Sequence, residues 1–222
     1  MPAAGIGPSP ADFIRTRLPL VPLSFRPDIA LHQPTPKSGL IGFLASQGRT
    51  DDPPFWAYAW AGGAALALYL RDHQEIVDGR SVLDFGAGSG LVGIAAAKAG
   101  ATEVLAFEPD PLGQTALALN TEANGVSITS ATADADAQIV LAGDVFYDAD
   151  VAARTLPTLA AHAARGATVL IGDPFRRDLP RDRIEQIGAY DVPDMGSAAL
   201  VRAGIFALRP WNIGYAPAIL PP

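Results

Sequence analysis

The sequence predicts an α/β protein built on a doubly wound, mostly parallel sheet. The first observation behind this prediction is an alternation of short apolar runs with longer alanine-rich segments from residue 62 onwards. Such alternation is typical of strands and helices that follow one another in a parallel sheet. The second is the segment VLDFGAGSGLVG, residues 82–93, in which a glycine-rich turn joins an apolar strand to a helix. Sheets of this class bind ligands at the carboxyl ends of their strands, next to such turns.

Seven strands are expected, and the segment of residues 81–85 is a short, largely apolar run. The strands cover residues 81–85, 103–107, 127–131, 138–142, 167–172, 184–192 and 200–209. The helices expected after residue 60 cover residues 64–71, 90–99, 111–124 and 149–165, and Pro157 predicts a kink in the last of them. The last two strands have no helix between them, so they predict an antiparallel hairpin at the end of the sheet.

Residues 1–60 differ from the rest because prolines recur throughout them. Proline interrupts long helices, so only short helices are expected here, over residues 10–17 and 39–45. We therefore expect residues 1–60 to form an ordered arm or lid, and residues 61–222 to form a single globular domain.

The composition excludes several classes of function. A net charge of −7 and a pI of about 4.8 disfavour nucleic acid as a partner and favour a basic or lysine-bearing protein. The chain has no cysteine, and its three histidines lack ligand spacing, so no metal site is expected. No apolar run approaches the roughly 20 residues of a membrane span, and no secretory signal is visible. These features predict a cytoplasmic protein without a membrane partner.

Acidic residues accompany the glycine turn formed by Gly86, Gly88 and Gly90. Glu108 ends the next strand, 22 residues after Gly86, where a carboxylate can accept hydrogen bonds from both hydroxyls of an adenosine ribose. Nicotinamide dinucleotides and S-adenosylmethionine both suit this arrangement. Asp84, which precedes the turn, would repel a pyrophosphate but favour the amino group of a methionine moiety. The pattern therefore favours S-adenosylmethionine.

The segment LAGDVFYDAD, residues 141–150, ends a buried strand with a carboxylate and two aromatic rings. A core strand has no need of Asp144, Phe146 and Tyr147 at its end, whereas a site at the carboxyl edge of the sheet can use them. Asp144 and Asp148 also suit the cap of the next helix. Capping and binding both remain open from the residues alone, although Asp148 is the better candidate for the cap.

Several segments together resemble class I, seven-β-strand, S-adenosylmethionine-dependent methyltransferases. Within this class the chain resembles the lysine methyltransferases that modify the β-subunit of electron transfer flavoprotein. The resemblance extends over residues 27–176 and is most specific in the tryptophan-rich entry PFWAYAWAGG, in GDVFYD and in GDPFR. It implies a Rossmann-like fold, methyl transfer to protein lysines, and S-adenosylhomocysteine as the product. The family usually has proline where Ala61 stands.

The resemblance also implies roles for individual residues. Asp144 and Tyr147 would form the catalytic end of a lysine channel, and Trp56, Trp60 and Phe146 would line that channel. The residues expected to hold the methyl donor are Trp60, Asp84, Gly86, Gly88, Gly90, Glu108, Pro109 and Gly143. The acid that meets the adenine amino group would be Asp134 or Asp136, with Asp134 favoured.

Other functions compete with this interpretation. One is methylation of a ribosomal protein, another is nicotinamide-dependent oxidoreduction, and a third is a binding module without catalysis. Trp56 and Trp60 are four residues apart, so they are also compatible with two core anchors on one helical face.

Overall fold

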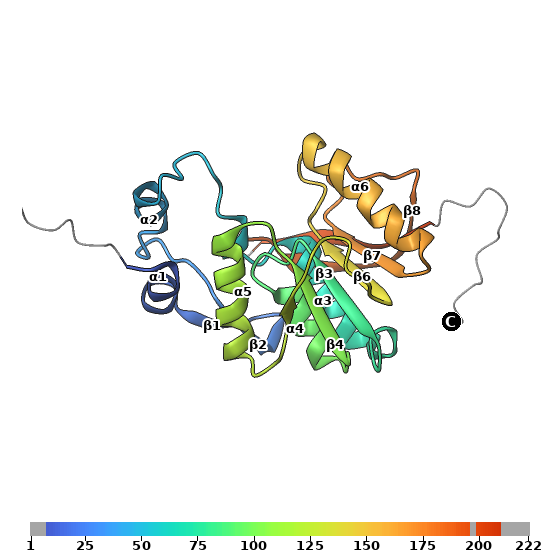
Figure 1. Ribbon diagram of the computed structural model, residues 1–222, viewed down its shortest axis with the longest axis horizontal. Coiled ribbons are helices and arrows are strands. Elements are labelled where there is room, and N and C mark those ends of the chain that lie inside the picture. Colours follow the sequence, from blue (N-terminus) through green and yellow to red (C-terminus); the bar gives the residue numbers. More distant parts are fainter. Residues whose placement is uncertain (1–7, 196–198, 210–222) are drawn as a thin grey trace, which may run out of the picture.

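A computed structural model of the chain describes residues 8–195 and 199–209 (Figure 1). Its main feature is a seven-stranded sheet in the order β5-β4-β3-β6-β7-β9-β8. The strands are β3 (Ser81–Phe85), β4 (Glu103–Phe107), β5 (Thr129–Ser130), β6 (Ile139–Gly143), β7 (Thr168–Asp173), β8 (Ile184–Pro193) and β9 (Leu200–Leu208). Strands β3 to β7 run parallel, and β9 pairs antiparallel with both β7 and β8. The predicted fold class is confirmed, including the antiparallel terminal hairpin.

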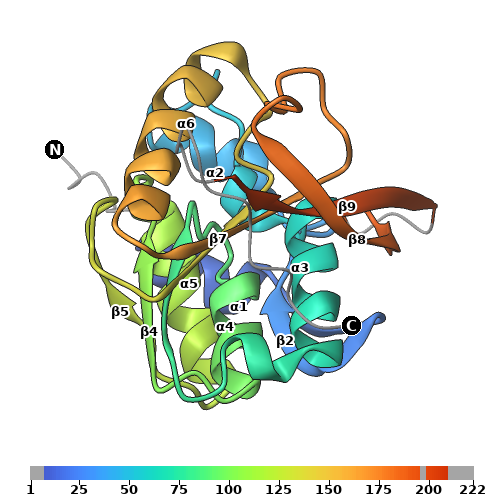
Figure 2. The ribbon, with the colours of Figure 1, turned by 90° about the vertical axis from the view of Figure 1, so that its right-hand side faces the viewer.

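Helices cover both faces of the sheet, as Figure 2 shows. The helices α3 (Ala61–Asp72), α4 (Leu91–Lys98) and α5 (Pro111–Ala123) lie on one face, and α6 (Ala149–Ala164) lies on the other. Successive side chains of a strand point to opposite faces. Accordingly, Val82 packs in the core beneath α3 and α4, while its neighbour Leu83 packs in the core beneath α6. These strands are buried on both faces, which explains their continuous apolar runs.

Residues 8–60 contain more helices and strands than the sequence predicted. They comprise α1 (Pro10–Arg17), β1 (Leu20–Leu23), β2 (Arg26–His32), α2 (Leu40–Ser46) and a short 3-10 helix, η1 (Phe55–Ala57). Strands β1 and β2 form an antiparallel hairpin that was not predicted, and Pro22 and Pro27 lie within these strands. An isolated two-stranded hairpin is only marginally stable, and β2 is supported by its packing on α5. The division into an arm and a domain stays a prediction, and residues 1–7, 196–198 and 210–222 lie outside the described residues.

Polar side chains of α5 tie the arm to the domain. The Asn120 side-chain oxygen accepts a hydrogen bond from the His32 amide at 2.8 Å, and its amide nitrogen donates to the Ser89 carbonyl at 2.8 Å. Asn124 binds the backbone of Ala30 through both its oxygen, at 3.0 Å, and its nitrogen, at 2.7 Å. Asn120 is fully buried, so these bonds satisfy polar groups that water does not reach. The arm is thereby held beside the glycine turn.

Two details of the helices and strands differ from expectation. Strand β5 is reduced to two residues, whereas helix α6 (Ala149–Ala164) agrees with the expected helix and contains Pro157; the kink expected there stays a prediction. Helix α3 begins at Ala61, three residues earlier than predicted, so Gly62 and Gly63 lie inside it. No helix among the described residues has the length and apolar character needed to cross a membrane.

Glycine allows the start of α3 to approach the sheet closely. A Cβ atom on Gly62 would lie 2.1 Å from the carbonyl oxygen of Gly172 in β7, and a Cβ atom on Gly172 would lie 2.1 Å from the carbonyl oxygen of Gly62. Only residues without a side chain can occupy both positions at this separation. This approach brings the amino end of α3 to the carboxyl ends of β6 and β7.

Candidate active site

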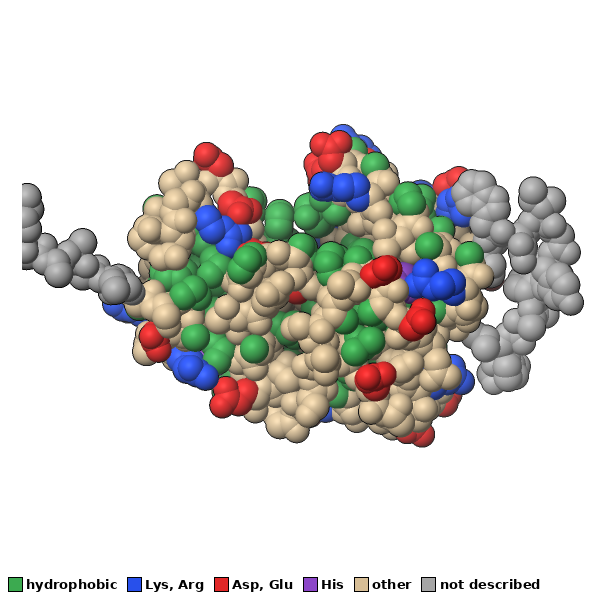
Figure 3. All heavy atoms as spheres, in the orientation of Figure 1, with side chains coloured by type: hydrophobic (Ala, Val, Ile, Leu, Met, Phe, Trp, Pro, Cys, Tyr) green, Lys and Arg blue, Asp and Glu red, His purple; other side chains and the backbone are tan. Residues whose placement is uncertain are grey.

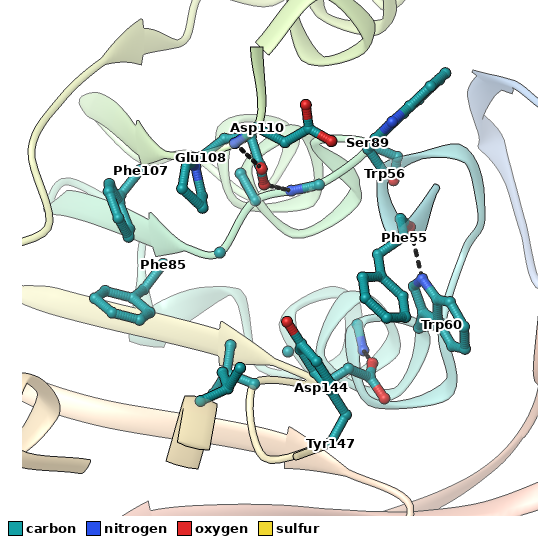
Figure 4. Close-up of a pocket in the computed structure, with 18 of the residues that line it drawn as sticks. Phe55, Trp56, Trp60, Phe85, Ser89, Phe107, Glu108, Asp110, Asp144 and Tyr147 are labelled. Carbon is teal, nitrogen blue, oxygen red and sulfur yellow. Dashed lines mark hydrogen bonds between the residues drawn. The ribbon is translucent and has the colours of Figure 1, made fainter. Parts of the chain in front are cut away.

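The carboxyl ends of β3, β4 and β6 open onto a cavity of about 1070 Å³ (Figure 4). The arm supplies the facing wall, including Phe55, Trp56 and Trp60. In the space-filling view, hydrophobic side chains gather in the hollow between the lobes formed by α2 and α6 (Figure 3). The cavity thus occupies the position at which doubly wound sheets bind their ligands.

The glycine turn forms one end of the cavity. Gly86 and Gly88 line it, with φ angles of 75° and 52°, in the left-handed region that favours glycine. The amides of Gly86 and Ala87 both donate to the Phe107 carbonyl, at 2.9 and 3.0 Å, which holds the turn against β4. Gly90, with a φ of 84°, precedes α4 and lies behind the wall, where a Cβ atom would be 2.5 Å from Leu117.

Glu108 closes the turn from the end of β4. One carboxylate oxygen accepts a hydrogen bond from the Gly88 amide at 2.6 Å, and the other accepts from the Asp110 amide at 2.8 Å (Figure 4). Burial raises the pKa of Glu108, and these two hydrogen bonds oppose the rise. The side chain is therefore held in one orientation beside the turn, and Pro109 lines the cavity next to it.

Asp84 lines the same end of the cavity as the glycine turn and is almost completely buried. Its carboxylate accepts a hydrogen bond from the Gly93 amide at 2.7 Å. Burial raises the pKa of Asp84 to about 7, with the Gly93 hydrogen bond opposing the shift and the nearby Glu108 charge adding to it. A carboxyl group in this state gains from a cationic ligand, because a positive charge offsets the cost of its ionisation.

Asp144 forms the opposite end of the cavity, after β6. Its backbone φ of 59° is unusual for a residue with a side chain, and its amide donates to the Gly172 carbonyl at 2.9 Å. One carboxylate oxygen accepts from the Gly63 amide at 2.8 Å, and the other forms an ion pair with Arg176. Burial raises the pKa of Asp144 to about 6, although Arg176 and the Gly63 amide act in the opposite direction.

Aromatic rings surround the space beside Asp144. The rings of Phe55 and Tyr147 have centroids 4.8 Å apart, and those of Phe55 and Trp60 are 5.8 Å apart (Figure 4). The Trp60 indole nitrogen donates to the Phe55 carbonyl at 2.7 Å, and the Arg176 guanidinium lies 5.9 Å from the Trp60 ring centre. Tyr147 is 44% exposed, so this aromatic group lies at an accessible part of the cavity.

Most of the residues predicted for the site share this one cavity. It is lined by Trp56, Trp60, Asp84, Gly86, Gly88, Glu108, Pro109, Gly143, Asp144 and Tyr147. Trp56 and Trp60 do not share a helical face, because Trp56 belongs to η1 whereas Trp60 immediately precedes α3. Trp56 is 2% exposed and packs in the core of the arm as well as on the cavity wall.

Besides Gly90, two predicted residues do not line the cavity. Phe146 is fully buried in the core beneath α6, because the turn after β6 directs Asp144 and Tyr147 to the cavity and the intervening ring inwards. The exposed Asp134 accepts a hydrogen bond from the Thr132 hydroxyl at 2.6 Å, and its neighbour Ala133 lines the cavity instead. Asp136 pairs with Arg165 at 3.5 Å, away from this cavity. Phe146 and Asp134 therefore do not line the cavity, and the contacts expected of them with the acceptor lysine and the adenine stay predictions.

Sequence reasoning missed two contributors to the site. Phe55 was overlooked beside the two tryptophans, although a third aromatic residue in the same short segment was a usable signal. Arg176 belongs to the GDPFR segment, which carried the family resemblance but gave no role to this residue. Asp148, by contrast, accepts hydrogen bonds from the amides of Asp150 and Val151 at the start of α6, which confirms its assignment as a helix cap.

The residues present fit S-adenosylmethionine. The glycine turn leaves part of the wall without side chains, so a ligand can approach the backbone there. Glu108 offers a fixed acceptor for ribose hydroxyls, and the buried Asp84 suits a cationic amino group. The cavity is also large enough for a nucleoside together with an acceptor side chain.

Comparisons with solved structures support the fold. A protein of Pyrococcus horikoshii described as a candidate RNA methyltransferase superposes with a TM-score of 0.53, at 15% identity, over 74% of this chain and 91% of that one. A protein of echinomycin biosynthesis superposes with a TM-score of 0.50, at 17% identity, over 78% and 93% of the two chains. At these identities the likeness concerns the fold alone.

Sequence comparisons identify the family. A family model for ribosomal protein L11 methyltransferase (PrmA) matches residues 64–166. The electron transfer flavoprotein beta subunit lysine methyltransferase of Rattus norvegicus is 36% identical over 183 residues, which are 77% of this chain and 71% of that protein. The homolog of that enzyme in Caenorhabditis elegans is 30% identical over 182 residues, or 70% and 72% of the two chains. This chain therefore belongs to the electron transfer flavoprotein beta subunit lysine methyltransferase family, within the class I S-adenosylmethionine-dependent methyltransferases.

Proposed function

We propose that this protein methylates lysine side chains of the β-subunit of electron transfer flavoprotein. The observation that carries the proposal is that Asp144 and an aromatic group lie at one end of the cavity whose other end holds the glycine turn and Glu108. Donor and acceptor sites in one cavity are what a direct transfer between two molecules requires. The β-subunit is proposed because relatives that match over most of their length carry that substrate in their names.

The donor end would use residues around the glycine turn. We assign the ribose hydroxyls to Glu108 and the methionine amino group to Asp84, while Gly86, Gly88 and Pro109 shape the wall. S-adenosylmethionine supplies a methyl group already activated by its positively charged sulfur. The protein has mainly to align the acceptor with that methyl group and to exclude water.

The acceptor end would receive the lysine between aromatic rings. A free lysine has a pKa near ~10.4, so its nucleophilic neutral form is scarce at pH 7. Phe55, Trp60 and Tyr147 can contact the aliphatic part of the side chain and attract its cationic form through their ring faces. Asp144 would orient the amine by accepting a hydrogen bond from it.

The proposal also covers partners and location. An acidic chain of net charge −7 suits a protein that presents lysine, and the reaction needs neither a metal nor nucleic acid. We propose that the protein has no membrane partner. The cytoplasmic location stays a prediction.

Labelled methyl transfer tests the proposal directly. Purified flavoprotein is incubated with the enzyme and labelled donor, and its lysines are mapped by mass spectrometry. We expect label on the β-subunit with the wild type, a strong loss with Asp144→Asn, and retention with the matched control Asp148→Asn. Asparagine at position 148 preserves the helix cap, so that control isolates the effect of the cavity carboxylate.

Parallel assays separate the competing functions. The ribosomal protein L11 is offered as an alternative acceptor because the family model for its methyltransferase matches residues 64–166. Label on that protein, with none on the flavoprotein, would replace the proposed substrate. Absence of label from every protein of a matched lysate would favour a binding module without catalysis.

A further inference from the structure

The carboxylate proposed to receive the substrate amine already has a cationic partner. Arg176, in the loop after β7, forms an ion pair with Asp144 and lines the same cavity. The charged groups around Asp144, Arg176 and Asp173, belong to the end of β7 and its loop, and the start of α3 contributes the neutral Gly63 amide as a hydrogen-bond donor. Arg176 is therefore the cation that balances Asp144.

Arg176 is held in place by contacts on more than one side. Its backbone amide donates to the Asp173 carboxylate at 2.7 Å, and its guanidinium lies 3.7 Å from the other oxygen of that carboxylate. Asp173 is completely buried, and this second oxygen accepts no hydrogen bond from any residue that the structure describes. The Trp60 ring lies on the guanidinium at 5.9 Å. The buried Asp173 carboxylate and the Trp60 ring together fix the position of the Arg176 guanidinium. An ion pair on the protein surface would lack these contacts.

The chemistry of the acceptor explains why such a cation is useful. An amine attacks the methyl group only in its neutral form, and a buried carboxylate without a partner stabilises the ammonium form. The same carboxylate, if left unpaired, tends to take up a proton and then loses its ability to orient the amine. A guanidinium does not deprotonate in proteins, so it opposes both effects at every working pH.

We propose that Arg176 is a positioning residue that keeps Asp144 ionised and oriented while it cancels the negative charge that would hold the substrate amine as an ammonium. The proposal rests on the proposed function, since it concerns the acceptor end of that cavity. It assigns Asp173 the supporting task of fixing the Arg176 backbone, because its carboxylate accepts a hydrogen bond from the Arg176 amide.

The pH dependence of kcat/KM tests this role. Arg176→Met is compared with the wild type between pH 5.5 and 9.5, with Arg176→Lys as the variant that retains a charge. Removing the cation raises the pKa of Asp144 and of the bound amine, so the acidic limb moves up by about 1 pH unit or more. At neutral pH this gives roughly a tenfold loss, which a higher pH restores. The matched control is Arg177→Met, whose exposed side chain pairs with Asp178 and should leave the profile unchanged.

A second variant should shift the acidic limb of the kcat/KM profile in the opposite direction. Asp173→Asn keeps an acceptor for the Arg176 amide but removes a negative charge that raises the pKa of Asp144. The acidic limb should then move to lower pH. Calorimetric binding of S-adenosylmethionine by each variant checks that the donor end and the fold are intact.

A titration without turnover separates this inference from the proposed function. The carbon-13 resonance of the Asp144 carboxyl, assigned with Asp144→Asn, should titrate at higher pH in Arg176→Met than in the wild type. An equal loss of activity at every pH, with an unmoved carboxyl titration, would overturn the inference and leave Arg176 as a loop brace. A wild type that labels no flavoprotein lysine would refute the proposed function, while the titration would still decide what Arg176 does to Asp144.

Discussion

The buried carboxyl of Asp84 should make the free protein less stable as the pH rises. Burial raises its pKa from 3.8 to about 7, so the folded state binds the proton more tightly than the unfolded state. The proton therefore stabilises the fold at low pH, and this stabilisation is lost as the pH rises from about 4 through about 7. A difference of about 3 pKa units corresponds to about 4 kcal/mol, which is an upper value for this contribution.

Asp84→Asn removes the charge and keeps an oxygen that can accept from the Gly93 amide. The free energy of unfolding of the variant relative to the wild type should therefore increase with pH, by up to about 4 kcal/mol between pH 4 and pH 8. Urea denaturation of both proteins at pH 4, 5, 6, 7 and 8, without methyl donor, measures this difference. Because both proteins retain Glu108, Asp144 and Asp173, whose pKa values are also raised by burial, the difference isolates Asp84.

Two results would refute this reasoning about Asp84. If the unfolding free energies of wild type and variant changed in parallel with pH, the carboxyl would titrate at the same pH in the folded and unfolded states. If the variant gained most at pH 4, the sign of the shift would be wrong. Calorimetry then measures how tightly each protein binds S-adenosylmethionine. We expect the more stable variant to bind it more weakly, because a site that is costly for stability is commonly retained for function.

Three further changes test the site and its scaffold. Glu108→Ala should weaken donor binding about tenfold or more, measured by calorimetry, because a charged acceptor is lost; unchanged affinity would remove Glu108 from the donor site. Gly62→Ala should cost about 3 kcal/mol or more in urea denaturation, because its Cβ atom would lie 2.1 Å from the Gly172 carbonyl oxygen. The matched Gly63→Ala, whose nearest contact would be 3.5 Å, should stay within about 1 kcal/mol of the wild type, and equal losses would contradict the close-approach argument. Asp144→Asn should lower kcat about 100-fold with donor affinity preserved, and intact turnover would disprove its orienting role.

The outline of the sheet was predictable because its signals are local. The strand of residues 81–85 contains the apolar residues Val82, Leu83 and Phe85, and the three glycines after it are needed for positive φ angles whatever the surroundings. The acid at the end of β4 follows from the chain order of strands in such folds. Likewise, Asp148 could be assigned as a helix cap, since a cap bonds amides only two and three residues ahead.

Contacts between distant segments were not predictable in this way. The hairpin of β1 and β2 is supported by Asn120 and Asn124, which lie about 90 residues further along the chain. The start of α3 is similar: Trp60 provides no side-chain cap, and the amides of Ala61 and Gly63 donate instead to Asp194 and Asp144. No local sequence pattern predicts partners of this kind, because the free amides at the start of a helix can donate to any acceptor that the fold brings close.

The sequence by itself determined the sheet, the glycine turn and the family, and therefore the methyl donor. Local propensity, apolar periodicity and short motifs are properties of neighbouring residues, which a chain carries before it folds. Only the tertiary structure decided that Phe146 points into the core while Tyr147 reaches the cavity, and that Asp144 meets Arg176. The physical reason is that a side chain's burial, its pKa and its ion-pair partner depend on residues brought together from separate strands, helices and loops, which become neighbours only in the folded chain.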